Sequence, residues 1–228
     1  MSLTQVSDHK DLDIVTYIGQ PELPNLIQQF LHHQLWSDSD SLASDSDICT
    51  SSLPIRNTKI YLHKSASSVF FAPSDPCGIR GFRREQIRAT WEWRGGPPRQ
   101  DTVLVNTGDG GNTQLPMSGY VVVRLLILFS FTYNGHDFPV ALVHWYALSD
   151  DSGRWDDATG MWLVEREYRN GGPHLAVVHV EAIFRAVHLL PYFGYEPVKR
   201  GVTRDNSLDV YGMFYVNKYA DHQSFEIL

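Results

Sequence analysis

The sequence has little cysteine and no long uninterrupted apolar run. Cys49 and Cys77 are the only two cysteines in 228 residues, too few for a disulfide framework, and neither has the Cys-x-x-Cys or Cys/His spacing that binds zinc. The longest apolar stretch, Tyr120 to Phe131, is interrupted by Arg124 and is about half of the ~20 residues that a spanning helix needs. These absences exclude a disulfide-stapled scaffold and a helical membrane span.

Motifs of catalysis and of metal or cofactor binding are also missing. The ten histidines form no His-x-x-x-His pattern, although His179 and Glu181 would share one face of an expected strand. The glycine-rich loop 108–112 lacks the Lys-Ser/Thr ending of a phosphate loop, and no Gly-x-Ser-x-Gly elbow occurs. We expect a protein that is not an enzyme and uses no metal and no cofactor, with a nuclease or other hydrolase as the minor alternative.

The start of the chain lacks the basic and apolar regions of a secretory signal peptide, so an intracellular protein is expected. A net charge of −7 argues against a generally basic nucleic-acid coat protein but permits a local basic face. The composition, 43% hydrophobic and 12% aromatic, is typical of a chain that folds with much β structure.

The first 50 residues are expected to form an N-terminal helix and an acidic linker. Apolar residues recur at three- and four-residue spacing over residues 23–36, and Pro24 falls in the first turn, which predicts an amphipathic helix. The run 37–47 repeats Ser and Asp with almost nothing apolar to bury, which is typical of a linker. The main domain is therefore expected to span residues 51–228.

In that domain, β-branched and aromatic runs alternate with turns rich in Gly, Pro, Asn and Asp. The expected strands are 59–71, 87–93, 102–106, 121–133, 138–148, 161–167 and 175–180. The pair 120–133 and 138–148 is joined through Asn134-Gly135, a dipeptide that favours a tight hairpin turn. The sequence predicts a mainly β fold, a partly open or closed β-barrel, with an N-terminal and a C-terminal α-helix.

Two details of this barrel are specified by side-chain spacing. In the central hairpin, Val121, Val123, Leu125 and Ile127 would share one core-facing side of a strand, opposite alternate residues of the partner strand. At the end of the chain, Asn206 would cap a closing helix over 206–220, with apolar side chains on one stripe.

The segment Arg80–Arg99 stands out by its charge. Six arginines against two glutamates give a local charge of +4 in a protein of −7. Tryptophans between them could stack beside guanidinium groups, a combination suited to phosphates and bases. Core packing of the tryptophans and ion pairing of the arginines is the alternative. The candidate nucleic-acid-binding residues are Arg80, Arg83, Arg84, Arg88, Arg94, Arg99, Trp91 and Trp93.

A second candidate site is an aromatic cage for a methylated ammonium group, held by cation–π attraction. Core packing of the same rings is the alternative, and residue-burial habits favour it. The five candidate cage residues are Trp145, Tyr146, Trp155, Trp162 and Tyr168.

Several strings of the sequence resemble the C-terminal region of large proteins encoded by DNA transposons of the Plavaka and KDZ kind in mushroom-forming fungi. They are Phe71–Asn106, Arg124–Asp151, Asp156–Glu165, Val177–Gly194 and Ser207–Leu228. In such proteins the transposase core, where present, lies upstream of this region. The resemblance therefore implies an accessory module without catalytic residues.

A looser similarity in pattern, over about residues 100–192, is to bromo-adjacent homology (BAH) domains, which are β-barrels that bind histone tails or other nuclear proteins. Together the two resemblances imply a nuclear module that binds DNA or chromatin. The alternative is a structural or oligomerisation module of a larger transposase, using exposed apolar area on the two helices.

Overall fold

The computed structural model describes residues 2–7, 19–36, 59–72, 80–149 and 155–228. The acidic run 37–47, the expected boundary near residue 50 and both cysteines lie outside these residues. No described helix is long and apolar enough to cross a membrane.

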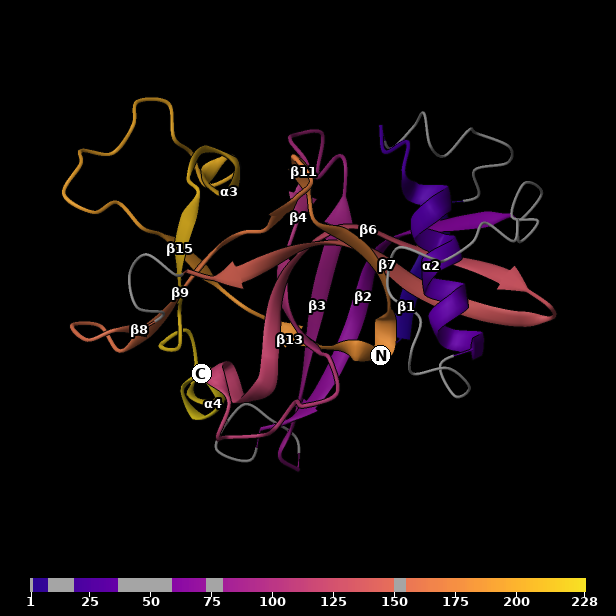
Figure 1. The fold of residues 1–228 in the computed structure, drawn as a ribbon, viewed down its shortest axis with the longest axis horizontal. Helices are drawn as coiled ribbons and strands as arrows, with labels where there is room; N and C mark the ends of the chain where they lie inside the picture. The colour runs from indigo at the N-terminus through magenta and orange to yellow at the C-terminus, as the bar shows by residue number, and fades with distance from the viewer. Residues whose placement is uncertain (1, 8–18, 37–58, 73–79, 150–154) are drawn as a thin grey trace.

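The chain is mainly β, as predicted (Figure 1). The strands are β1 Ser2–Ser7, β2 Ile60–Phe71, β3 Phe82–Thr90, β4 Arg99–Gln100, β5 Thr102–Asn106, β6 Tyr120–Tyr133, β7 His136–Leu148, β8 Trp155–Asp156, β9 Met161–Arg166, β10 Tyr168–Arg169, β11 Gly172–Pro173, β12 Leu175–His179, β13 Ile183–Ala186, β14 Leu189–Pro191 and β15 Met213–Val216. The helices are α2 Leu23–Trp36, α3 Ser207–Val210 and α4 His222–Ile227, with 3-10 turns η2 Pro116–Gly119 and η3 Val180–Ala182.

All strands but β10 and β11 belong to one antiparallel sheet, whose main path runs β14-β15-β9-β7-β6-β2-β3-β4. The two long central strands each pair with two partners along one edge: β6 with β5 and then β2, and β7 with β12 and then β9. The short segment β4–β5 passes from the edge of β3 to the edge of β6. This sharing of edges curls the sheet around its own interior.

The central hairpin of β6 and β7 is the one predicted from the sequence. Tyr133 pairs with His136, and the two turn residues, Asn134 and Gly135, have φ of 50° and 79°. Positive φ at both positions is what a two-residue turn of this kind requires, and asparagine and glycine tolerate it best.

A β-bulge changes which residues of β6 face the interior. Leu125 lies opposite Val143 and Ile127 lies opposite Leu142, so Leu126 is an extra residue in the ladder. The amide of Gln100 donates a hydrogen bond to the Leu126 carbonyl at 3.2 Å. Because one inserted residue reverses the alternation, the prediction that Ile127 shares a face with Val123 and Leu125 is wrong.

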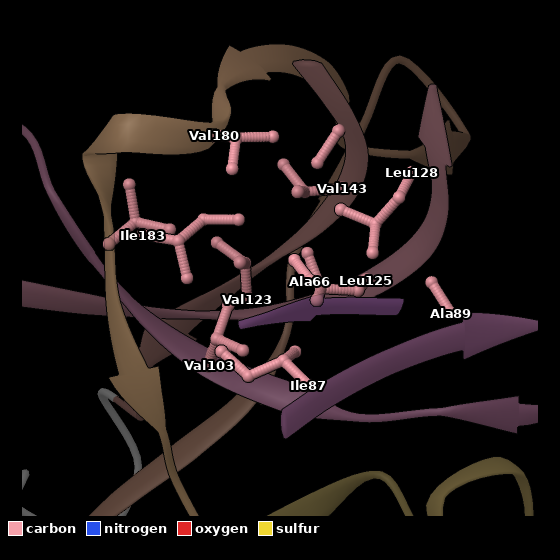
Figure 2. Close-up of a cluster of buried hydrophobic side chains, with 12 residues drawn as sticks. Ala66, Ile87, Ala89, Val103, Val123, Leu125, Leu128, Val143, Val180 and Ile183 are labelled. Atoms are coloured by element: carbon pink, nitrogen blue, oxygen red, sulfur yellow. The ribbon is translucent and has the colours of Figure 1, made fainter. Parts of the chain in front are cut away.

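The interior of the curl is filled by small and branched side chains from six strands and η3, and Figure 2 shows them pointing toward one another. They are Ala66, Ile87, Ala89, Val103, Val105, Val123, Leu125, Leu128, Ala141, Val143, Val180 and Ile183. All are at most 4% exposed, so the interior is a packed core.

Helix α2 covers the opposite face of β6, β7 and β12, as an amphipathic helix should (Figure 1). Leu23, Ile27 and Leu31 are buried on this face. Phe30 packs edge-on against Phe131 and Phe138, with ring centroids 6.5 and 6.0 Å apart. Beside it, β1 adds a strand to β2 that the sequence did not predict.

The C-terminal helix predicted over 206–220 is wrong. The chain forms the short helix α3, then β15 between β14 and β9, and then α4. Gly212 follows the end of α3, and Phe214 and Val216 are both fully buried in the third core cluster. The apolar residues that predict one face of a helix also alternate as in a strand. Packing of this segment between two neighbouring strands favours the strand.

Candidate nucleic-acid interface

Strand β3 divides the arginine-rich segment between two faces of the sheet. Ile87 and Ala89 point into the interior core, so Arg83, which has the same parity, lies on that face. Arg84 and Arg88 lie on the outer face, where the Arg84 Nε donates to the Ser67 hydroxyl at 2.6 Å. The segment therefore does not present its six arginines on one surface.

The turn after β3 builds a cluster of arginines around one ring. Trp93 and Gly96 form a β-bridge across a turn in which Arg94 and Gly95 have φ of 55° and 73°. The guanidinium carbon of Arg88 lies 4.7 Å from the centroid of the Trp93 ring, and those of Arg94 and Arg99 each lie 5.4 Å from it. Cation–π attraction from one indole thus holds three positive groups together.

This cluster forms part of the wall of a cleft of about 920 Å³. Three further arginines, remote in sequence, line the same cleft, so that six arginines face four carboxylates. The arginines are Arg88, Arg94, Arg99, Arg124, Arg185 and Arg204, and the carboxylates are Glu85, Asp101, Asp205 and Asp221. The cleft carries an excess of two positive charges in a protein of −7.

Some of these cations are neutralised. Arg99 pairs with Asp101 at 3.0 Å and Arg204 with Asp205 at 3.4 Å, while Arg124 forms a two-pronged contact with Asp209. Over the residues for which the structure gives positions, Arg88 and Arg94 have no carboxylate partner. These two guanidinium groups, both on Trp93, are the ones available to an incoming anion.

The far end of the cleft is closed by a partly buried ionic network. Arg185 is 3% exposed, lies 4.6 Å from the Phe70 ring and forms a bidentate ion pair with Asp221. Although burial raises the pKa of Asp221, hydrogen bonds from Arg185 and from the Ser224 backbone amide outweigh burial and lower this pKa to about 2. Arg83 lies 3.7 Å from the same carboxylate.

Glu85 completes this network from β3, where its carboxylate accepts a hydrogen bond from the Ala186 backbone amide. Burial raises the pKa of Glu85 more than its favourable contacts lower it. With Arg185 already paired to Asp221, this end of the cleft ties β3, β13 and α4 together and offers no uncompensated cation.

Four residues predicted for the interface lie outside the lining of the cleft. Arg80 is exposed in the turn before β3, and Arg83 lies near Asp221. Arg84, which lies on the same face of β3 as Arg88 but nearer the start of the strand, donates to Ser67. Trp91 is 38% exposed, but it follows the end of β3 and does not line the cleft. Of the predicted set, Arg88, Trp93, Arg94 and Arg99 are brought together there.

The five candidate cage residues are spread over separate environments. Tyr146 is 2% exposed, in the core cluster that holds Phe214, and burial raises its pKa to about 12. Trp145, its neighbour on β7, stacks on His174, and Tyr168 packs edge-on against His144. The predicted cage is therefore not assembled from this set.

Trp155 and Trp162 do meet, with ring centroids 4.8 Å apart, and a cation lies beside them. The ammonium of Lys218 is 4.7 Å from the Trp155 ring and 5.4 Å from each of Tyr219 and Phe225. This aromatic site is filled by a lysine of the same chain, so it fastens α4 to β8 and β9.

Metal-ligand geometry is absent from the ranges given above: no group of three or more His, Cys, Asp or Glu side chains there could hold an ion. The two residues singled out from the sequence, His179 and Glu181, approach to 3.9 Å. Their backbones form the start of η3, where the His179 ring accepts from the Glu181 amide, so the pair caps a turn.

Sequence reasoning missed Arg124, Arg185 and Arg204, which the fold brings to the cleft. Arg124 and Arg185 have no charged neighbour within three residues in the sequence, so no local charge run marks them, and Arg204 belongs to a short charged stretch, 199–205, far from the segment 80–99. Arg124 gives the one usable signal, since it interrupts an apolar strand and a charge there must find a partner.

No protein-family model, no curated protein and no solved structure matches this chain.

Proposed function

We propose that this protein binds nucleic acid through the phosphate backbone, using the arginine-lined cleft beside Trp93. The observation that supports this most directly is the pair of guanidinium groups, on Arg88 and Arg94, that share one indole and have no carboxylate partner among the described residues. Guanidinium forks match phosphate oxygens, and arginine keeps its charge at any physiological pH.

The cleft favours phosphates over bases as the groups recognised. Trp93 is already covered by Arg88 at 4.7 Å and flanked by two more arginines, so its ring holds guanidinium groups in place and leaves little room for a stacked base. Binding carried by phosphate contacts depends on salt and reads little sequence.

The wider setting of this proposal follows from the resemblance to transposon-encoded proteins. We propose an accessory, non-catalytic module of such a protein, working in the nucleus on DNA or chromatin. We also propose that the curled part of the sheet is a partly open barrel, because β6 pairs with β2, β2 with β3, β3 with β4, and β5 with β6.

An assembly role remains the second candidate, on a different surface from the one first expected. Helix α2 buries its apolar face, so it offers no broad stripe to a partner. At the open end of β2 and β3, however, Val69, Phe71 and Phe82 are 60%, 57% and 53% exposed, and the two phenylalanine rings touch. An exposed cluster of this kind suits contact with another protein.

The proposal is tested by fluorescence anisotropy with a short labelled duplex at low salt. The wild type should bind with a Kd on the order of 10⁻⁵ M, typical of non-specific contacts. The double variant Arg88→Gln/Arg94→Asn should bind roughly tenfold more weakly, since it removes the two cations of the cleft that have no carboxylate partner among the described residues. Asparagine is chosen at 94 because it tolerates the positive φ there.

Arg169→Gln is the matched control, because this exposed arginine belongs to the separate β10–β11 hairpin. It removes a cation without touching the cleft and should leave the affinity unchanged. Equal loss in the control and the double variant, or no binding by the wild type, would contradict the proposal. Self-association that Phe82→Ser abolishes would favour assembly.

A further inference from the structure

A second pocket, of about 340 Å³, lies where strands β9, β15 and β14 meet the chain that follows β14. Its floor is a row of three side chains on neighbouring strands. Glu165 lies directly opposite Met213, and the Tyr192 backbone amide donates to the Met213 carbonyl at 2.9 Å. Cross-strand neighbours share a face of the sheet, so a carboxylate, a thioether and a phenol ring stand side by side.

Aromatic rings and a second carboxylate form the walls. The Phe193 ring meets the Tyr211 ring edge-on, with centroids 5.1 Å apart and an interplanar angle of 89°. A turn in which the Glu196 amide donates to the Phe193 carbonyl at 3.2 Å brings Glu196 to the rim. Both rings line the pocket, and because the faces of an aromatic ring are electron-rich and its edges are electron-poor, a cation there would bind against a ring face.

The charge of the pocket is negative overall. Glu165 and Glu196 contribute two carboxylates, and in the part of the chain that the structure describes neither has an ion-pair partner. The one cation is Lys199, whose ammonium lies 5.6 Å from the centroid of the Tyr211 ring. The chain's own lysine thus approaches an aromatic face in this pocket from its exposed rim.

We propose that this pocket binds an alkylammonium group, with Phe193 and Tyr211 as its aromatic walls and Glu165 and Glu196 as counter-charges. Ring quadrupoles attract ammonium groups, and methyl groups around the nitrogen lower its cost of desolvation while keeping its charge. Lys199 competes with the ligand for the Tyr211 face. This pocket shares no lining residue with the Trp93 cleft, and binding of its ligand does not depend on nucleic-acid binding.

Two ligands of similar shape, one charged and one neutral, test whether the pocket recognises the charge of an ammonium group. Choline and its neutral isostere 3,3-dimethylbutan-1-ol are titrated into the whole chain carrying methyl-labelled methionine, and the NMR signal of the Met213 methyl group is followed. Choline should shift this signal with saturation, and the neutral isostere should shift it little at the same concentrations. An equal response to both compounds would overturn the proposal, because the pocket would then recognise shape alone.

Three variants locate the site. Phe193→Ala and Glu165→Gln should each weaken choline binding about fivefold or more, and Lys199→Gln should tighten it by a similar factor by removing the competing ammonium. Glu181→Gln, an exposed carboxylate at η3, is the matched control and should change nothing. An unchanged affinity in both Phe193→Ala and Lys199→Gln would overturn the proposal even if the wild type binds choline.

A last titration distinguishes a protein side chain from a free small molecule as the source of the ammonium group. The compound Nα-acetyl-lysine amide, which carries a lysine side chain, is titrated in the same way. Tighter binding than choline would assign the ammonium to a side chain of a protein partner, and weaker binding would assign it to a free quaternary amine. Both outcomes support an alkylammonium site, and binding of neither compound overturns it.

Discussion

Asp221 is the residue on which several parts of the molecule converge. Its carboxylate accepts from Arg185 on β13 and caps α4 through the Ser224 amide, which donates at 2.8 Å. Breaking a buried charged pair costs more than the pair contributes, because one charge is then left without a partner. This residue should therefore matter to stability far more than its position near the chain end suggests.

The pH dependence of stability should report on Asp221. Its folded-state pKa of about 2 lies below the unfolded value of about 3.9, so the ionised carboxylate stabilises the fold above about pH 4 and loses this effect as the pH falls toward 2. We expect a contribution of about 2 kcal/mol. Asp221→Asn should be less stable at neutral pH in urea titrations, and its stability should change less over this acid range.

The pKa of Glu85 is shifted in the opposite direction to that of Asp221, so Glu85 provides a second test of the pH dependence of stability. Burial raises its pKa, so its charged form costs stability that is recovered on acidification. Glu85→Gln should therefore steepen the acid loss that Asp221→Asn flattens. Identical acid profiles for the wild type and Asp221→Asn would show that the ion pair does not form in solution.

Tyr146 is a buried residue whose hydroxyl group affects stability in a different way. Its hydroxyl is buried and, within the described ranges, has no hydrogen-bond partner, which costs free energy that a phenyl ring would not. Tyr146→Phe should leave the protein equally stable or up to about 1 kcal/mol more stable, measured by the urea midpoint. A loss of more than this would mean that the hydroxyl has a partner in solution.

At the scale of elements, the side chains that specify the central hairpin are local, whereas those that specify its neighbours are not. Asn134-Gly135 sets the turn, and the alternation of β7 sets its partner faces, so both could be predicted. The bulge at Leu126 could not, because no residue there is unusual and the extra residue is accommodated by Gln100 from another strand.

The residues of the candidate site also divide into those that the local sequence indicates and those that only the fold brings together. The segment 80–99 is recognisable by its charge, but strand alternation sends Arg83 and Arg84 to opposite faces, and only a turn returns Arg94 to Arg88. Arg185, which the fold places in the same cleft, has no local signal. The sequence therefore indicated four of the residues that line the arginine-rich cleft, whereas the remaining arginines are brought to it only by the fold.

The docking of α2 is testable by mutation. Phe30 is 6% exposed and packs against two rings, so Phe30→Ala should reduce the free energy of unfolding by about 3 to 5 kcal/mol in urea titrations followed by tryptophan fluorescence. Leu35 on the same helix is 45% exposed, and Leu35→Ala should cost less than about 0.5 kcal/mol. Equal effects would show that the helix is not held by this face.

At the scale of the whole molecule, opposite charges are separated in space. The chain carries −7 overall, yet the Trp93 cleft has an excess of two arginines over carboxylates, while the smaller pocket beside β15 has one more carboxylate than ammonium. The negative net charge of the chain weakens long-range attraction to a polyanion, while the local excess of arginine directs a polyanion to the cleft. Binding should therefore be weak, local and sensitive to salt.

The salt dependence of nucleic-acid binding tests the central claim most directly. With about three phosphates in contact, log affinity for duplex DNA should fall with log salt at a slope of about −3, and Arg88→Gln/Arg94→Asn should make the slope shallower by about 1 to 2. Arg80→Gln/Arg84→Gln, outside the cleft lining, should leave the slope unchanged. A slope near zero for the wild type, or equal flattening by both double variants, would contradict the assignment of this cleft.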